Sequence, residues 1–289
     1  MTIVDTNKMT ELIDRQRRFF TEVMAFRPIA DDVRLRDTAL GAIPTLEVTI
    51  EGTRPSGVML WIHGGAFVAG SPRNTLAPAA NVARAARTRV LSIDYRLAPE
   101  HPHPAPLDDA LAAYRALLDE VPIDEITVGG ESAGGTLALG LLVAARDAGL
   151  PLPRAAVVFS PASDLTMAGE SYRTKATVDP VVTAEALQAA FHAYLGGTNA
   201  GRPLVSPLFA DLAGLPPTLV QAGSHEVLLD DATRLASRLA AADVAVTLEV
   251  TPGMSHVFQA KGSEVPEAAW ALENVGRFLR QSLDNRGSA

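Results

Sequence analysis

Short apolar runs alternate with longer amphipathic stretches from about residue 45 to the end of the chain. Near-continuous apolar runs of this kind are typical of strands that are covered on both faces. We expect strands at residues 45–51, 58–62, 90–94, 126–129, 155–160, 218–222 and 245–250. We expect helices between them at residues 76–87, 106–118, 134–147, 230–241 and 266–283, with Asp230 as the N-cap of the fourth. The alternation predicts an α/β fold with a mostly parallel central sheet, helices on both faces and functional residues at the carboxyl ends of the strands.

Two segments do not follow this alternation. Residues 1–30 precede the sheet and carry apolar side chains at helical spacing, namely Leu12, Ile13, Phe19, Phe20, Val23 and Met24. Residues 165–203 form a long insertion after the strand that ends at Ser160, with a helix expected over 183–195 and ended by two glycines. We therefore expect N-terminal cap helices (1–30), an α/β domain (31–164 and 204–289) and a cap insertion (165–203). The alternative is that both segments are peripheral packing helices.

Composition and charge exclude several classes of function. The formal net charge is −8, and we interpret the one basic cluster, Arg15-Gln16-Arg17-Arg18, as the solvated face of a helix, so we expect no nucleic-acid partner. The chain has no cysteine, which rules out disulfides, thiolate metal sites and a thiol nucleophile. The first residues do not read as a signal peptide, and the longest apolar runs, such as 137–145, are too short to span a bilayer. We expect a cytoplasmic protein without a membrane span.

The pentapeptide Gly130-Glu131-Ser132-Ala133-Gly134 has the G-x-S-x-G pattern of a nucleophile elbow. It lies between an expected strand and an expected helix, which is the context that the pattern needs. A serine in so tight a turn requires small residues on either side, and the helix that follows points its N–H groups and positive dipole end at the site. Ser132 is therefore the candidate nucleophile.

A serine hydroxyl needs a base to take its proton, and a histidine is the expected base. Of the six histidines, His256 lies on the loop directly after the last expected strand. The others fit this role less well: His63 shapes a glycine loop, His101 and His103 flank prolines without a third metal ligand, His192 lies on the insertion helix, and His225 adjoins the acid candidate. We expect no metal site.

The acid that orients the base should follow the strand at 218–222. Glu226 is nearest to that strand end and is our choice. Asp230 and Asp231 remain alternatives, although capping and the helix dipole already explain them. The order Ser132, Glu226, His256 is the order of α/β-hydrolase triads.

The reaction also needs N–H donors for the oxyanion. The N–H of Ala133 follows the nucleophile directly, and the loop Trp61-Ile62-His63-Gly64-Gly65-Ala66-Phe67 follows an earlier strand. Its glycines allow backbone N–H groups to approach a substrate oxygen closely.

Together, the motifs resemble the bacterial hormone-sensitive lipase family (family IV) of carboxylesterases, in the α/β-hydrolase superfamily. The resemblance covers nearly the whole chain from about residue 45. It rests on the motifs at 63–67, 94–100 and 130–135 and on the loops with Glu226 and His256. It implies hydrolysis of small carboxylic esters with short to medium acyl chains, no cofactor, a helical cap, and oxyanion donors at Gly65 and Ala66, with Gly64 as a possible further donor. This chain departs from the family pattern in having Ala66 for the third glycine, Glu226 for aspartate, and Glu131 where many members have aspartate, which we interpret as support for the elbow.

Other functions of this scaffold remain to be compared. Lactone or amide hydrolysis would use the same triad. Relatives among the prolyl peptidases carry a large extra domain, for which this chain has no room. The plant gibberellin receptors resemble the family but lack the catalytic histidine, whereas His256 is present here. Some family members dimerise through their last strand and helix, here about residues 245–283, so a homodimer is an expectation.

Overall fold

An eight-stranded sheet forms the centre of the molecule, in the order β1-β2-β4-β3-β5-β6-β7-β8. The computed structural model describes residues 6–22, 24 and 29–284 of the chain. The first two strands pair antiparallel with each other and β2 pairs antiparallel with β4, whereas all other pairs are parallel. The strands are β1 (Val33–Leu40), β2 (Ile43–Ile50), β3 (Val58–Ile62), β4 (Arg89–Ile93), β5 (Ile126–Glu131), β6 (Ala156–Phe159), β7 (Thr218–Gly223) and β8 (Val246–Thr251).

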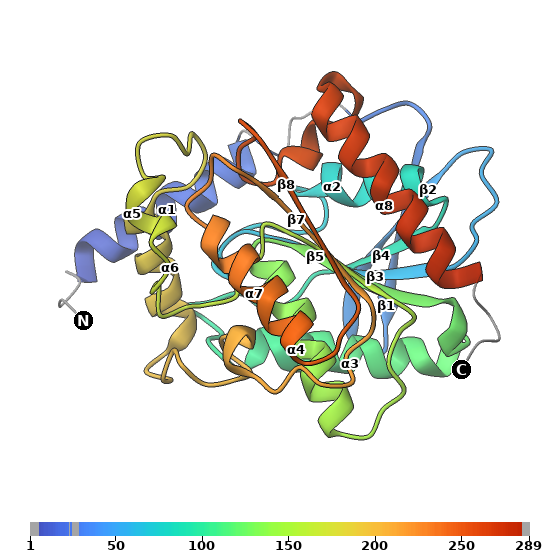
Figure 1. Ribbon diagram of the computed structural model, residues 1–289, viewed down its shortest axis with the longest axis horizontal. Coiled ribbons are helices and arrows are strands. Elements are labelled where there is room, and N and C mark those ends of the chain that lie inside the picture. The colour runs from blue at the N-terminus through green and yellow to red at the C-terminus, as the bar shows by residue number, and fades with distance from the viewer. Residues whose placement is uncertain (1–5, 23, 25–28, 285–289) are drawn as a thin grey trace.

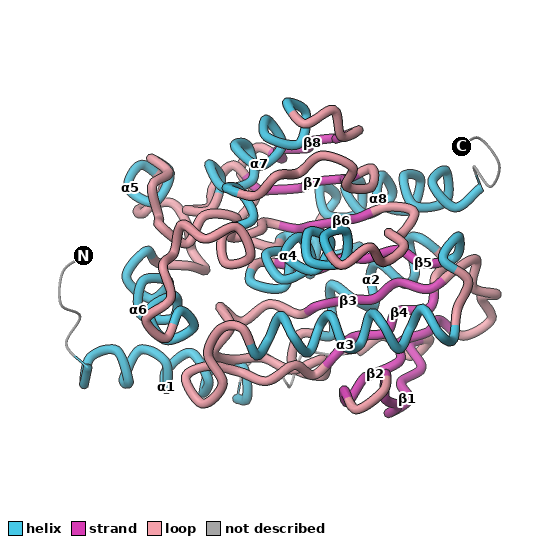
Figure 2. Tube along the Cα trace, turned by 90° about the horizontal axis from the view of Figure 1, so that it is seen from below, coloured by secondary structure: helices cyan, strands magenta, loops and turns pink. Residues whose placement is uncertain are grey.

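Helices cover both faces of this sheet (Figures 1 and 2). One face packs against α2 (Leu76–Ala86) and α8 (Pro266–Asp284), with Trp61 and Phe159 in the buried cluster between them. The other face packs against α3 (Ala105–Glu120), α4 (Ala133–Asp147) and α7 (Leu229–Ala241). Short 3₁₀ segments complete the fold at η2 (Ile123–Glu125), η3 (Pro207–Phe209) and η4 (Phe258–Glu264). The α/β fold with a mostly parallel sheet is thus confirmed.

Two details of the predicted elements are wrong. β1 was not predicted, because it is an amphipathic outer strand with exposed polar positions and lacks the continuous apolar run of the inner strands. Asp230 is not an N-cap, because α7 begins at Leu229 and Leu228 precedes it. The Asp230 carboxylate instead accepts the Ser171 N–H at 2.9 Å, so a tertiary contact explains this residue.

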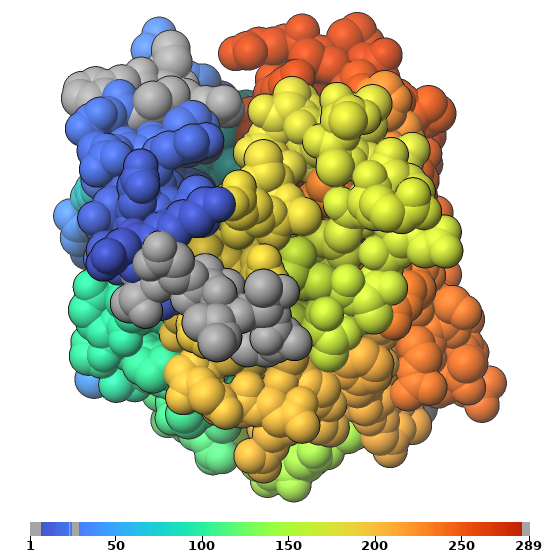
Figure 3. All heavy atoms as spheres, turned by 90° about the vertical axis from the view of Figure 1, so that its left-hand side faces the viewer, coloured from blue at the N-terminus to red at the C-terminus, as the bar shows by residue number. Residues whose placement is uncertain are grey.

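The two segments outside the alternation lie together at one end of the molecule, on the left in Figures 1 and 2. They contain α1 (Thr6–Glu22), α5 (Ser171–Thr174) and α6 (Ala184–Leu195). Figure 3 shows α1, in blue, beside the yellow surface of the insertion, and an ion pair of 2.5 Å joins Lys8 to Glu185 across this boundary. Val23, one of the apolar positions expected in the first segment, lies outside the described residues. The role of these segments as a cap stays a prediction.

We predicted that the basic cluster forms a solvated helix face. Arg17 is instead partly buried. Its side chain donates to the carbonyl oxygens of Val68 at 2.8 Å and Ala98 at 3.0 Å, and it forms an ion pair with Glu100 at 2.6 Å. Because Val68 follows the glycine loop after β3, Arg17 ties α1 to that loop. No described helix is long and apolar enough to cross a membrane.

Candidate active site

Ser132 occupies a sharp turn between β5 and α4. Its backbone angles, φ 54° and ψ −122°, are strained for a residue with a side chain. A Cβ atom at Gly134 would lie 1.9 Å from the Ile62 carbonyl oxygen, and one at Gly130 would lie 2.5 Å from the Gly134 carbonyl oxygen. Only glycine fits at these two positions, so the motif is required by the close approach of β3 and α4.

The structure brings His256 and Glu226 together. The His256 Nδ1 atom lies 2.8 Å from Glu226 Oε2, and the two side chains are 7% and 0% exposed. The other carboxylate oxygen, Glu226 Oε1, accepts the Gly223 N–H at 2.7 Å and the Ser160 hydroxyl at 3.1 Å. Both oxygens of this buried carboxylate therefore have hydrogen-bond donors, and Oε2 is the oxygen that faces the imidazole.

The two alternative acids are engaged elsewhere. Asp230 accepts the Ser171 N–H, as described above. Asp231 accepts the Asp164 N–H at 2.9 Å and the Tyr172 hydroxyl at 3.3 Å, and burial raises the pKa of its carboxyl well above the usual range. Of these three acids, Glu226 is the one that contacts His256.

Ser132 and His256 are not joined directly. The Ser132 hydroxyl forms no hydrogen bond with any of the residues that the structure describes, and 8% of the residue is exposed. Catalytic hydrogen bonds are often long without substrate and shorten when it binds. The arrangement therefore leaves the hydroxyl free to approach a substrate carbonyl.

The glycine loop after β3 presents two N–H groups. Within the described part of the chain, the N–H groups of Gly65, Ala66 and Ala133 have no hydrogen-bond acceptor. Gly64 differs, because its N–H donates to Glu131 Oε1 at 2.8 Å. The Gly64 N–H is thus engaged by Glu131 in the structure, and the N–H groups of Gly65, Ala66 and Ala133 are the oxyanion donors that we propose.

Ala66, the residue in place of the third glycine, has a φ of 52°, and Phe67 has a φ of 67°. A left-handed conformation costs a residue with a side chain about 1–2 kcal/mol. Phe67 is buried and stacks on Tyr194 of α6, with ring centroids 3.9 Å apart and an interplanar angle of 11°. The insertion thus holds the loop in a conformation that its own sequence disfavours.

Two buried ionisable residues, Glu131 of the elbow and His63 of the loop itself, form hydrogen bonds with Gly64. Burial raises the pKa of Glu131 to about 8, so its carboxyl is largely protonated at neutral pH. Burial lowers the pKa of the His63 imidazole to about 4, which keeps the ring neutral. His63 Nδ1 donates to the Gly64 carbonyl oxygen at 2.7 Å, and its ring stacks on Tyr95. The expected role of His63 in shaping the loop agrees with these contacts.

Ser160, whose hydroxyl contacts Glu226, was not predicted as a site residue. Its one sequence signal is its position at the end of an expected strand, beside the strand that precedes the acid. None of the remaining histidine side chains forms a hydrogen bond with Ser132, Glu226 or His256 in the described part of the chain: His225, His192 and His101 are exposed, and His103 lies 3.3 Å from the Tyr194 hydroxyl. No group of three or more histidine or carboxylate side chains in the described residues is arranged to hold a metal ion.

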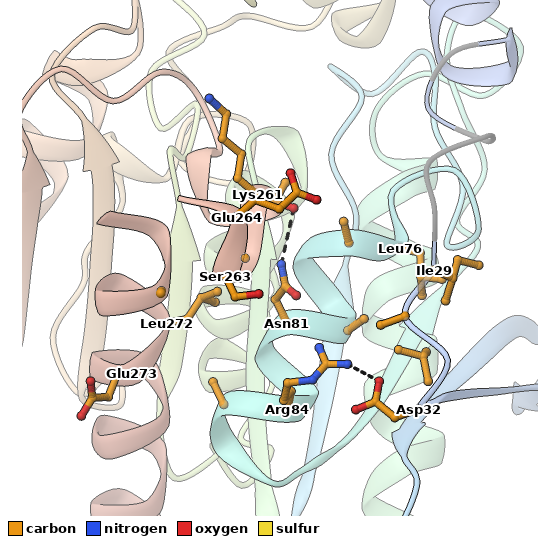
Figure 4. Close-up of a pocket in the computed structure, with 18 of the residues that line it drawn as sticks. Ile29, Asp32, Leu76, Asn81, Arg84, Lys261, Ser263, Glu264, Leu272 and Glu273 are labelled. Carbon is orange, nitrogen blue, oxygen red and sulfur yellow. Dashed lines mark hydrogen bonds and ion pairs between the residues drawn. The ribbon is translucent and has the colours of Figure 1, made fainter. Parts of the chain in front are cut away.

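A cavity of about 630 Å³ lies elsewhere, between α2, η4 and α8 (Figure 4). Figure 4 shows Leu76 and Leu272 on opposite sides of it, and Arg84 paired with Asp32 at its edge. None of the candidate catalytic residues lines this cavity, so it is separate from the site around Ser132.

Comparison with known proteins identifies the family. The family described as the alpha/beta hydrolase fold matches residues 59–260. A crystal structure of an esterase from the bacterial hormone-sensitive lipase family has a TM-score of 0.89 and 40% identity, covering 97% of this chain and 100% of that chain. The chain belongs to the bacterial hormone-sensitive lipase family of α/β-hydrolases. The resemblance that the sequence motifs indicated is thereby confirmed.

Two curated relatives align with most of the chain. An acetyl-hydrolase of Streptomyces hygroscopicus is 42% identical over 237 residues, which are 80% of this chain and 79% of that protein. An esterase of Acinetobacter venetianus is 37% identical over 272 residues, or 90% of this chain and 89% of that protein.

Proposed function

We propose that the chain is a serine carboxylesterase that hydrolyses esters with short to medium acyl chains through an acyl-enzyme intermediate. The observation that carries the proposal is the buried contact of 2.8 Å between His256 and Glu226, at the strand ends where Ser132 occupies a nucleophile elbow. Relatives named acetyl-hydrolase and esterase support an ester substrate, and the first of these names supports a small acyl group.

In the proposed mechanism, His256 removes the proton from Ser132 while the serine oxygen attacks the ester carbonyl. Glu226 accepts a hydrogen bond from the Nδ1–H of His256, which leaves Nε2 free as the base and stabilises the imidazolium that forms. The N–H groups of Gly65, Ala66 and Ala133 bind the oxyanion, which develops next to the positive end of α4.

The tetrahedral intermediate collapses when His256 returns the proton to the leaving alcohol, and the acyl group remains on Ser132. A water molecule then attacks the acyl carbonyl, and His256 takes its proton. The second intermediate releases the acid as His256 returns that proton to the Ser132 oxygen. The same donors serve both steps, because both intermediates place negative charge on the same oxygen.

We also propose that α1 and the insertion at 165–203 form the cap, whose side chains select the acyl group. The stacking of Tyr194 on Phe67 supports this assignment, because it places an insertion residue against the oxyanion loop.

Hydrolysis of p-nitrophenyl esters of increasing acyl length tests the proposal. We expect Ser132→Ala to lower kcat by about 10⁶ and Glu226→Gln by about 10⁴, because the acid sets the imidazole tautomer. Asp230→Asn is the matched control and should retain activity. A folded wild-type protein without activity on any ester, or an Asp230→Asn variant that is more impaired than Glu226→Gln, would contradict the assignment.

A further inference from the structure

Ser160 has an unusual conformation and complete burial. It follows β6 directly, it is 0% exposed, and its φ of 46° lies in the left-handed region, which a residue with a side chain rarely adopts. Its own N–H donates to the Gln221 carbonyl oxygen of β7 at 2.8 Å. The backbone therefore turns at the end of β6 and directs the side chain toward the loops that follow β7 and β8.

The Ser160 hydroxyl joins those two loops. It donates to Glu226 Oε1 at 3.1 Å and accepts the N–H of Val257 at 3.2 Å. Val257 is the residue after His256 and itself has a φ of 50°. A hydroxyl has one proton to donate and lone pairs to accept with, so both contacts are satisfied at once. One side chain thus contacts the acid and the backbone beside the base.

We propose that Ser160 is a positioning residue of the esterase reaction. Its hydroxyl holds the Glu226 carboxylate and the His256 loop in a fixed relation, so that Oε2 faces the imidazole. This inference rests on the proposed roles of Glu226 and His256.

The longer acid explains why such a contact is needed. A glutamate has one more rotatable side-chain bond than an aspartate, so its carboxylate has more orientations to lose. The Gly223 N–H and the Ser160 hydroxyl both bind Oε1, and this fixes the direction in which Oε2 points. Hydrogen bonds to a charged group are about twice as strong as those between neutral groups.

Ser160→Ala removes the hydroxyl without adding bulk, and Ser163→Ala is its matched control. Ser163 is also 0% exposed, and its hydroxyl donates to the Asp231 carbonyl oxygen at 2.8 Å, away from Glu226 and His256. We expect Ser160→Ala to lower kcat by about tenfold to a hundredfold, the range for a hydrogen bond to a charged group. KM should change less than about twofold, because Ser160 does not reach the exposed face of the site. Ser163→Ala should lower the melting temperature and leave kcat unchanged.

Ser160→Gly separates the hydroxyl from the backbone strain. Glycine also lacks the hydroxyl but adopts positive φ freely. Both variants should show the same loss of kcat, and the glycine variant provides a second test if the alanine variant does not fold. A glycine variant with wild-type kcat would overturn the proposal.

A double-mutant cycle with Glu226→Gln tests whether the hydroxyl acts through the acid. If it does, Ser160→Ala should lower kcat by less than about threefold in the Glu226→Gln background, because coupled residues are not additive. An equal loss in both backgrounds, or a loss confined to KM, would assign Ser160 a merely structural role. Full activity of Glu226→Gln alone would instead contradict the proposed triad, so the two failures can be told apart.

Discussion

Glu131 is largely uncharged at neutral pH, whereas a glutamate in water is ionised there. It is buried beneath the oxyanion loop, and its raised pKa of about 8 keeps a proton on it at neutral pH. The unfolded chain releases that proton above about pH 4.5, the ordinary value for glutamate. The folded state therefore binds more protons than the unfolded state between these two values, and its stability decreases as the pH rises through them.

Glu131→Gln should remove this pH dependence. The glutamine amide keeps an oxygen for the Gly64 N–H but does not ionise. Between about pH 5 and pH 8, we expect the free energy of unfolding of the variant to rise relative to that of wild type by on the order of a few kcal/mol. The melting temperature of the variant should rise with it. Thermal melts across this range measure the difference, in which the contribution of Asp231 cancels because both proteins contain it. Parallel curves for the two proteins would show that Glu131 ionises normally.

Some residues of the site could be predicted from the sequence and others could not. The nucleophile, the base and the acid could be selected because each follows an apolar run at a strand end. The engagement of the Gly64 N–H could not be predicted, because its acceptor is 67 positions away and reaches it through the packing of β3 on β5. The contact of Ser160 with Glu226 depends in the same way on the order of neighbouring strands.

At the scale of elements, the insertion holds the loop that carries the acid. Asp179 Oδ2 accepts the N–H of Val227, the residue after Glu226, at 2.9 Å. Ser171, also in the insertion, donates its hydroxyl to the Val227 carbonyl oxygen at 2.6 Å. Both backbone groups beside the acid are thus bound by the insertion, which therefore supports the loop as well as lying over the strand ends.

Asp179→Ala should loosen the acid loop. The change removes the acceptor of the Val227 N–H and of the N–H groups of Val181 and Val182. We expect kcat to decrease by about twofold to tenfold, because the loss of one typical hydrogen bond costs about 0.5–1.5 kcal/mol. Asp211→Ala is the control, because Asp211 makes a similar turn with Ala213 and does not contact the acid loop. Ester hydrolysis by the two variants makes the comparison. Equal kcat values would mean that the acid loop is rigid without Asp179.

The elements themselves were predicted to different degrees, for a physical reason. Inner strands such as β3 and β5 are buried on both faces and read as continuous apolar runs, so they were found. β1 is an outer strand that pairs only with β2 in the register Leu40 to Ile43, across a tight turn at Gly41. The half-exposed pattern of β1 gives little indication of a strand in the sequence. The two-residue turn between alternating runs is nevertheless typical of a β-hairpin and could have indicated this pair of strands.

The whole molecule has an outer strand at its other edge that is suited to pairing with a second copy. β8 is the last strand of the sheet, and its Leu248 and Val250 are each 38% exposed. An outer strand presents unpaired backbone groups, and pairing two such strands about a twofold axis closes a dimer. We therefore expect a homodimer through β8.

Charged side chains on this strand should prevent the pairing. We expect wild type to run as a dimer in light scattering after size exclusion, and Leu248→Lys combined with Val250→Lys to run as a monomer. Phe209→Lys is the control, because Phe209 is equally exposed, at 41%, but lies on η3. A monomeric wild type, or a double variant that stays dimeric, would exclude β8 as the interface.

The attachment of the oxyanion loop affects how this scaffold can be altered. Arg17 from α1 binds the Val68 carbonyl oxygen directly after the loop, and Tyr194 from α6 stacks on Phe67 at the end of the loop. The two regions expected to choose the acyl group therefore also hold the backbone that receives the reacting oxygen. Exchanging these regions between relatives to obtain a new selectivity would change the rate as well. In this scaffold, a change in acyl selectivity should therefore be accompanied by a change in kcat.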